Sequence, residues 1–146
     1  MGLLFAPTSA SACSCMPFPT DEAKAAAMAY ALADVIFLGT VKHIAPRRLS
    51  YMAVRDTTFD VKQSWKGLNG ADAVVVRSNN GEIACGYRFR KPGEYLVFAY
   101  WDADRQIFTT SMCDLNKEAS KAKSLIRELD KIRQMKGPIA QGKPIT

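Results

Sequence analysis

The sequence predicts one small, mainly β domain: a closed barrel of about five strands with a helix near each end of the chain. Three observations support this fold class. An alanine-rich segment precedes residue 34, β-branched and alternating apolar segments fill residues 35–110, and the apolar residues take a helical period after Cys113. The length of 146 residues, with 48% hydrophobic and 23% charged side chains, suits a single globular domain.

The first predicted element is a helix that follows the proline-containing segment 17–19. Thr20 is the expected N-cap, because its side-chain oxygen can accept a hydrogen bond from the first turn. Asp21 and Glu22 then place negative charge at the positive end of the helix dipole. Alanine-rich residues 23–33 continue the helix to its expected end near Asp34.

Several segments between the helices are expected to form strands. Residues 57–65 alternate apolar and polar side chains, which is the period of a half-buried strand. The expected strands are residues 35–41, 57–65, 73–76, 95–100 and 106–110. Loops or turns are expected at residues 46–48, 66–70, 79–81 and 102–104. The aromatic residues expected in the core are Phe59, Trp65, Tyr95 and Phe98.

The last predicted element is an amphipathic helix that Gly137 and Pro138 terminate. Its apolar residues share one face at helical spacing, whereas Lys and Arg occupy the other face. The apolar residues are Ala122, Leu125, Ile126, Leu129 and Ile132. The sequence contains no internal repeat. We therefore expect one domain over residues 13–137, followed by a flexible tail at 138–146.

Composition and motifs exclude several classes of protein. No run approaches the ~20 consecutive apolar residues of a membrane-spanning helix, which excludes a multi-span membrane protein. The single histidine, His43, excludes a multi-histidine metal site and is expected on the surface. The sequence has no H-E-x-x-H, phosphate-binding-loop, G-x-G-x-x-G or C-x-x-C motif. We therefore expect a protein that is not an enzyme and that carries no cofactor.

Residues 1–12 are typical of the remnant of a secretory signal peptide. They contain no charged side chain, and residues 10–12 match the A-x-A pattern after which signal peptidase cuts. Cleavage there would make Cys13 the first residue of a secreted, periplasmic or extracellular protein. Two alternatives stay open: acylation of Cys13 with anchoring as a lipoprotein, and an N-terminal tail that is no signal.

The four cysteines, Cys13, Cys15, Cys85 and Cys113, favour two disulfides in an exported domain of this size. A bridge between Cys13 and Cys15 would span a single residue, which fits disulfide geometry poorly. The two other pairings both tie the N-terminal segment to the middle and late parts of the chain. Zinc binding by four thiolates is the competing interpretation, but the spacing lacks the usual C-x-x-C knuckles.

Six short motifs of the sequence, by their order and spacing, resemble the inhibitory N-terminal domain of the tissue inhibitors of metalloproteinases, a netrin-like OB-fold family. The motifs are Cys13-Ser14-Cys15 with Pro17 and Pro19, Ala33-Asp34-Val35-Ile36, Trp65-Lys66-Gly67, Ala84-Cys85-Gly86, Glu94-Tyr95-Leu96-Val97 and Met112-Cys113-Asp114. They extend over nearly the whole of residues 13–137. The resemblance implies a five-stranded OB-fold-like barrel with both helices packed on it.

The resemblance also implies the bridges Cys13–Cys85 and Cys15–Cys113. In that family the α-amine and carbonyl of the N-terminal cysteine chelate the catalytic zinc of a target protease, a role that here falls to Cys13. The implied inhibitory tip is Cys13, Ser14, Cys15 and Met16, with Ser14 in the main specificity pocket and Met16 along the substrate groove. Glu82, Ile83 and Ala84 would add a second contact ridge. Cys13 and Cys15 as purely structural bridges are the alternative.

A second function class comes from the charge. Lys and Arg number 20 against 14 acidic residues, a net charge of +6. Residues 87–91 interleave aromatic and basic side chains, which is typical of a single-strand-binding face or of a two-faced strand with solvated arginines. The cations of the C-terminal helix region are Lys117, Lys121, Lys123, Arg127, Lys131 and Arg133. The alternative function is an extracytoplasmic, non-inhibitory module that binds a polyanion, a membrane surface or a protein. We expect a monomer and no nucleic-acid partner.

Overall fold

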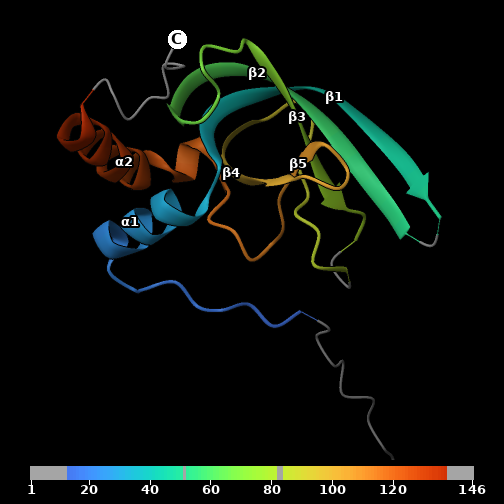
Figure 1. Ribbon diagram of the computed structural model, residues 1–146, viewed down its shortest axis with the longest axis horizontal. Helices are drawn as coiled ribbons and strands as arrows, with labels where there is room; N and C mark the ends of the chain where they lie inside the picture. Colours follow the sequence, from blue (N-terminus) through green and yellow to red (C-terminus); the bar gives the residue numbers. More distant parts are fainter. Residues whose placement is uncertain (1–12, 51, 82–83, 138–146) are drawn as a thin grey trace, which may run out of the picture.

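The computed structural model describes residues 13–50, 52–81 and 84–137. Its elements, in chain order (Figure 1), are α1 (Glu22–Leu32), β1 (Val35–Leu49), β2 (Met52–Lys66), β3 (Ala73–Asn79), β4 (Glu94–Asp102), β5 (Ile107–Thr109), β6 (Lys117–Glu118), a short 3-10 helix (Ala119–Lys121) and α2 (Lys123–Lys136). The predicted signal remnant at 1–12, the tail at 138–146, and Glu82 and Ile83 lie outside the described residues.

The strands form one sheet whose pairings close into a ring. The strand order is β1-β2-β3-β5-β4-β6, and a further pairing joins β1 to β4. The ring therefore passes through β1, β2, β3, β5 and β4. The β3–β5 pairing is parallel and the other pairings are antiparallel. The predicted mainly β architecture with two helices is confirmed.

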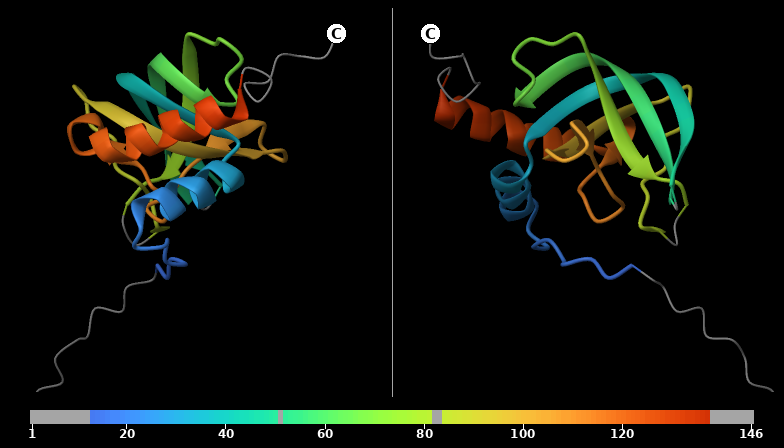
Figure 2. Two further views of the ribbon diagram at one scale, coloured as in Figure 1. Left: turned by 90° about the vertical axis from the view of Figure 1, so that its left-hand side faces the viewer. Right: turned by 45° about the vertical axis from the view of Figure 1, so that its right-hand side comes forward.

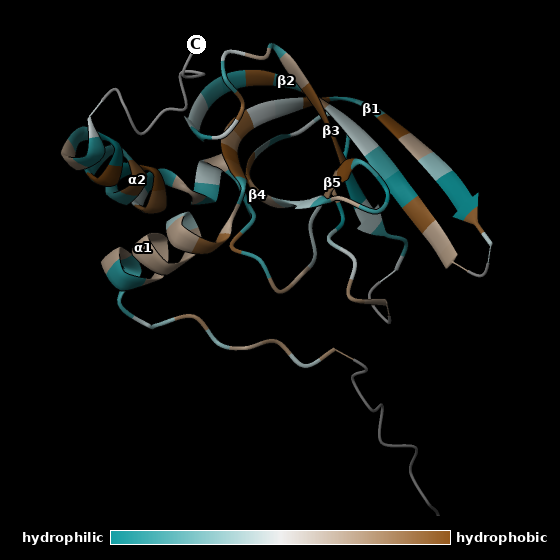
Figure 3. Ribbon diagram, in the orientation of Figure 1, coloured by the Kyte–Doolittle hydropathy of each residue, from teal (hydrophilic) through white to brown (hydrophobic). Residues whose placement is uncertain are grey.

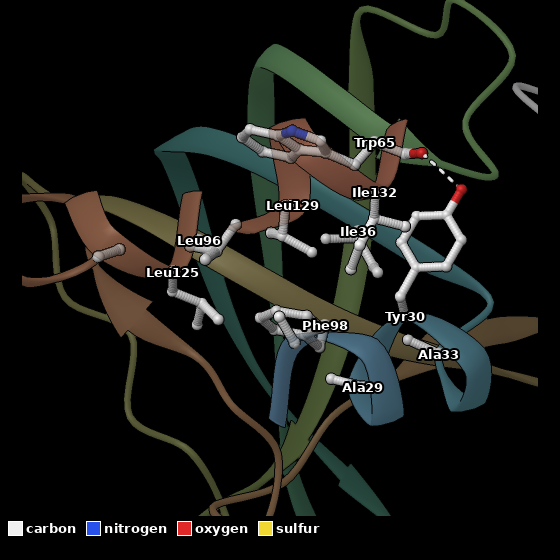
Figure 4. Close-up of a cluster of buried hydrophobic side chains, with 12 residues drawn as sticks. Ala29, Tyr30, Ala33, Ile36, Trp65, Leu96, Phe98, Leu125, Leu129 and Ile132 are labelled. Carbon is white, nitrogen blue, oxygen red and sulfur yellow. Dashed lines mark hydrogen bonds between the residues drawn. The ribbon is translucent and has the colours of Figure 1, made fainter. Parts of the chain in front are cut away.

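Two clusters of buried side chains hold this arrangement together. One fills the ring and includes Phe37, Phe59, Val76 and Val97, which come from four different strands. The other lies between the outer face of the ring and the two helices, which run side by side (Figures 1 and 2). Figure 4 shows this second cluster, in which residues from α1, α2, β1, β2 and β4 meet and Trp65 lies at one side, next to α2. All four aromatic residues expected in the core are buried.

The N-cap of α1 is Asp21, so the prediction of Thr20 was wrong by one residue. The Asp21 carboxylate accepts a hydrogen bond from the backbone amide of Lys24 at 2.9 Å. Glu22 begins the helix and supplies the acidic first turn. Aspartate can satisfy one of the exposed N–H groups at the helix start as well as threonine can, and the chain enters the helix one residue later.

The predicted loop at residues 46–48 was wrong, because these residues belong to β1. They pair with β2 as Pro46 with Arg55, Arg47 with Val54 and Arg48 with Ala53. In the described chain β1 pairs with β4 only from Val35 to Thr40, so its second half has a partner strand on one side only. Proline is tolerated in such an edge strand although it lacks an N–H group. β2 accordingly starts at Met52 rather than at residue 57.

The amphipathic face predicted for the C-terminal helix is confirmed. Leu125, Leu129 and Ile132 are buried in the helix-facing cluster, and Ile126 packs against its edge. Two polar contacts fix the helix: Asp130 accepts a hydrogen bond from the indole of Trp65 at 2.8 Å, and the Ser124 hydroxyl donates to Glu22 at 2.7 Å. In the described ranges, no helix is long and apolar enough to cross a membrane.

Candidate functional site

Two disulfides attach the segment before α1 to two loops of the ring. Cys13 bonds to Cys85 with 5.5 Å between their Cα atoms, and Cys15 bonds to Cys113 with 5.2 Å. These are the same pairs that the family resemblance implies. Figure 1 shows that this segment runs without secondary structure ahead of α1. Phe18 of the same segment also packs against the helix-facing cluster, so the segment is held at both of its ends.

The first loop, around Cys85, is held by a side-chain hydrogen bond from the end of β3 and by a backbone hydrogen bond within the loop. The side-chain amide of Asn79 donates to the carbonyl of Ala84 at 2.8 Å. Gly86 donates its amide to Gly81 and lies so close to Asn79 that a Cβ atom would overlap the Asn79 carbonyl oxygen. Cys85 itself has a φ of 60°, in the left-handed region. Glycine at position 86 allows the chain to turn tightly enough to present Cys85.

The second loop, around Cys113, is held by a polar network. The Asp114 carboxylate accepts hydrogen bonds from the Ser111 amide at 2.8 Å and from the Thr110 hydroxyl at 3.1 Å. The Ser111 hydroxyl oxygen in turn accepts from the Cys113 amide at 3.1 Å. Buried Asn116 donates to Thr110 and accepts from the Phe98 amide, both at 2.8 Å. The network connects Cys113 to β4.

The two loops also contact each other directly. The Met112 amide donates to the carbonyl of Cys85 at 2.9 Å. The loops of Cys85 and Cys113 therefore support each other, and both bridges join the N-terminal segment to this pair of loops. Sequence reasoning did not find the supporting residues Asn79, Asp114 and Asn116. The hydrogen-bond partners of these residues depend on how the loops fold, so their role leaves no periodic pattern in the sequence.

The residues of the N-terminal tip are exposed except for Cys13. Met16 is 77% exposed and Met112 is 43% exposed. Ser14 and Ala84 are also exposed, whereas Cys13 is half-buried. The structure thus brings together Cys13, Ser14, Cys15, Met16 and Ala84 of the predicted site. Glu82 and Ile83 lie outside the described residues. The exposed side chains form a surface that a partner can contact.

A cavity of ≈ 390 Å³ lies beside the second loop, between the β1–β2 hairpin, β3 and β5. Its charged side chains are paired with acids: Arg77 with Asp56 at 2.7 Å and Arg105 with Asp102 at 3.1 Å. Burial raises the pKa of Tyr100, which also lines it, to about 12, and the neighbouring Asp114 carboxylate adds to that increase. The tyrosine is therefore neutral at physiological pH. Both arginines of this cavity already have a carboxylate partner within the protein.

The predicted basic segment forms no strand, although all its residues, 87–91, are described. The two-faced-strand interpretation was therefore wrong in its secondary structure. The alternation persists without a strand: Phe89 is buried in the ring, whereas Arg88 and Arg90 are exposed. On α2, Lys123, Arg127 and Lys131 are exposed. Among the described residues, no group of three or more His, Cys, Asp or Glu side chains could hold a metal ion.

No protein-family model matches this chain, and no curated protein matches it.

Proposed function

We propose that this protein is a secreted inhibitor of zinc metalloproteases with a netrin-like OB fold. The observation that carries the proposal is the double attachment of its N-terminal segment, through Cys13 and Cys15, to two loops that are hydrogen-bonded to each other. The closed ring of strands β1, β2, β3, β5 and β4 supports the OB fold, which is a small Greek-key barrel of five strands.

The chemistry depends on the backbone of Cys13. Cleavage after Ala12 would convert the amide nitrogen of Cys13 into an α-amino group next to the Cys13 carbonyl. Both atoms could chelate a catalytic zinc, which can become five-coordinate, and would thereby displace the water that attacks the substrate. An α-amino group has a pKa of about 7.7–8.0, so its neutral, metal-binding form is accessible at neutral pH.

The side chains around Cys13 would supply the remaining contacts. Ser14 would enter the main specificity pocket of the protease, and Met16 would lie along its substrate groove. Ala84, with Glu82 and Ile83, would form a second ridge beside them. Because two bridges fix the segment before binding, less conformational entropy is lost on association, which favours tight binding.

The test compares two forms of the protein that differ only at the N-terminus. One form begins at Cys13, and the other carries a single additional alanine before Cys13, which converts the amine back into an amide. Both are assayed against a panel of zinc metalloproteases, with a serine protease as the negative control. We expect inhibition by the first form and at least a hundredfold weaker inhibition by the second, about 2.7 kcal/mol in binding free energy.

Mass spectrometry under non-reducing conditions verifies that both forms contain the two disulfides. Failure of the correctly bridged Cys13 form to inhibit any protease of the panel would contradict the proposal. Equal inhibition by the two forms would also contradict it, because the blocked amine would then have no role.

A further inference from the structure

The arginines of this protein divide into two groups by their contacts. Arg47, Arg77, Arg105 and Arg133 each form an ion pair with an aspartate, at 2.7–3.1 Å. Within the described part of the chain, no side-chain hydrogen bond or ion pair involves the other five, which are Arg48, Arg55, Arg88, Arg90 and Arg127. Four of these five lie on two segments, the β1–β2 hairpin and residues 87–91, and Arg127 lies on α2.

The strand register places Arg48 and Arg55 on the same face of the hairpin. Arg55 lies opposite Pro46, and Arg48 lies opposite Ala53, two residues away along β2. Side chains of such diagonal partners are about 7–8 Å apart on one face of a sheet. Arg47 and Asp56 point to the other face, where they form their ion pair at 3.1 Å. Figure 3 shows the hydrophilic colour of β1 near the hairpin end.

Arg88, which is not part of a strand, lies next to Arg55 of the hairpin. A small cavity of ≈ 80 Å³ is lined by Arg55 and Arg88 together with Asn79, Asn80, Gly81, Gly86 and Tyr87. Tyr87 anchors this segment, since its amide donates to the Ser78 hydroxyl at 2.7 Å. Arg48, Arg55 and Arg88 therefore gather on one surface, which we call the arginine surface.

This arrangement is unfavourable for the protein alone, because like charges repel and each guanidinium lacks a carboxylate partner among the described residues. Tyr87 does not supply a negative charge: burial raises its pKa to about 12. Unpaired charges of the same sign are expected on a surface that binds a ligand of opposite charge. The guanidinium group suits oxyanions in particular, because it donates two parallel hydrogen bonds and is weakly hydrated.

We propose that the arginine surface binds sulfate groups of a sulfated polysaccharide. The cavity between Arg55 and Arg88 has room for one such group, and Arg48 lies one step along the hairpin to contact the next. Two disulfides suit an oxidising compartment, in which polysaccharides are the common polyanions. The site uses none of the tip residues, so it stands independently of protease inhibition.

The experiment compares two triple variants of the full chain that each remove three positive charges. R48Q/R55Q/R88Q changes the arginine surface, and K123Q/R127Q/K131Q changes the exposed face of α2. Affinity for heparin is measured by titration at fixed ionic strength. We expect the first variant to bind about tenfold more weakly than the unmodified chain and the second to stay within about twofold. Circular dichroism and disulfide mapping control for folding.

Three outcomes would overturn the proposal, and a fourth would support it. Equal losses in the two variants would overturn the proposal, because net charge alone would then explain binding. Equal affinity for heparin and for chemically desulfated heparin would overturn the role of sulfate. Tighter binding to a single-stranded oligonucleotide or to anionic phospholipid vesicles than to heparin would overturn the choice of polysaccharide. Loss of binding confined to R48Q/R55Q/R88Q, with sulfate required, supports it.

Discussion

Gly86 stands where any side chain would collide with the backbone of the neighbouring strand. Its Cβ position overlaps the carbonyl oxygen of Asn79, and the chain cannot move away without displacing Cys85. A glycine with a positive φ but open surroundings, such as Gly70, makes a useful contrast. The two positions separate steric overlap from the general cost of replacing glycine.

We predict that Gly86→Ala lowers the free energy of unfolding by about 3 kcal/mol, because backbone must shift to admit the methyl group. Gly70→Ala should cost about 1 kcal/mol, the price of a left-handed conformation for alanine. Urea denaturation of both variants with the disulfides intact provides the measurement. Similar losses for the two variants would mean that the loop at Gly86 adapts easily.

Asp56 connects two strands at the scale of the element. Its side chain is 8% exposed and binds Arg77, 14% exposed, through two hydrogen bonds of 2.7 and 2.8 Å. Asp56 and Arg77 are cross-strand partners on β2 and β3, and Arg47 of β1 joins them from the edge. The carboxylate therefore ties three strands together and compensates a nearly buried guanidinium.

We predict that Asp56→Ala lowers the free energy of unfolding by about 3 kcal/mol, since Arg77 would remain buried without its counter-charge. The control is Asp60→Ala on the same strand. Asp60 is 57% exposed and its ion pair with Lys42 is 3.7 Å long, so its loss should cost at most about 0.5 kcal/mol. Thermal and chemical unfolding of the two variants measure the difference. A cost for Asp56→Ala as small as that of the control would show that Arg77 finds another partner.

The two disulfides act at the scale of the whole molecule. They close segments of 72 and 98 residues, and both start from the same short N-terminal segment. Once one bridge has formed, the second bridge closes a loop of only about 30 residues. This loop consists of the chain between Cys85 and Cys113, the chain between Cys13 and Cys15, and the first bridge, so it is the same for both orders of formation. The chain-entropy model therefore assigns the same stabilisation to both.

We predict that C13A/C85A and C15A/C113A each lower the free energy of unfolding by about 3.5 kcal/mol and agree with each other within about 0.5 kcal/mol. Guanidinium denaturation of the two double variants tests the equality. A twofold difference between them would show that contacts of one loop, rather than loop entropy, determine the stabilisation.

Periodic features could be predicted from the sequence. The α2 face with Leu125, Leu129 and Ile132 and the buried aromatic residues Phe59 and Trp65 followed from spacing alone. Periodicity reports which side of an element is apolar, and burial of that side is the main driving force of folding. The motif order also suggested the same cysteine pairs that the structure contains.

Non-periodic features were predicted poorly because distant partners determine them. Pro46 and the arginines beside it indicated a loop, but pairing with residues 53–55 of β2 extends the strand through them. Residues 87–91 alternate like a strand, yet they form none, and Phe89 is buried in the cluster inside the ring. Local sequence contains no information on whether a neighbouring strand is available to accept backbone hydrogen bonds.

The sequence by itself therefore determined the class of fold and the apolar faces, whereas the inhibitory tip that it suggests stays a prediction. Only the tertiary structure decided that the loops of Cys85 and Cys113 contact each other, that Asp56 neutralises Arg77, and that Arg48, Arg55 and Arg88 meet on one surface. Apolar patterning depends on near neighbours in the chain, whereas charge compensation and loop support depend on contacts between residues far apart in sequence.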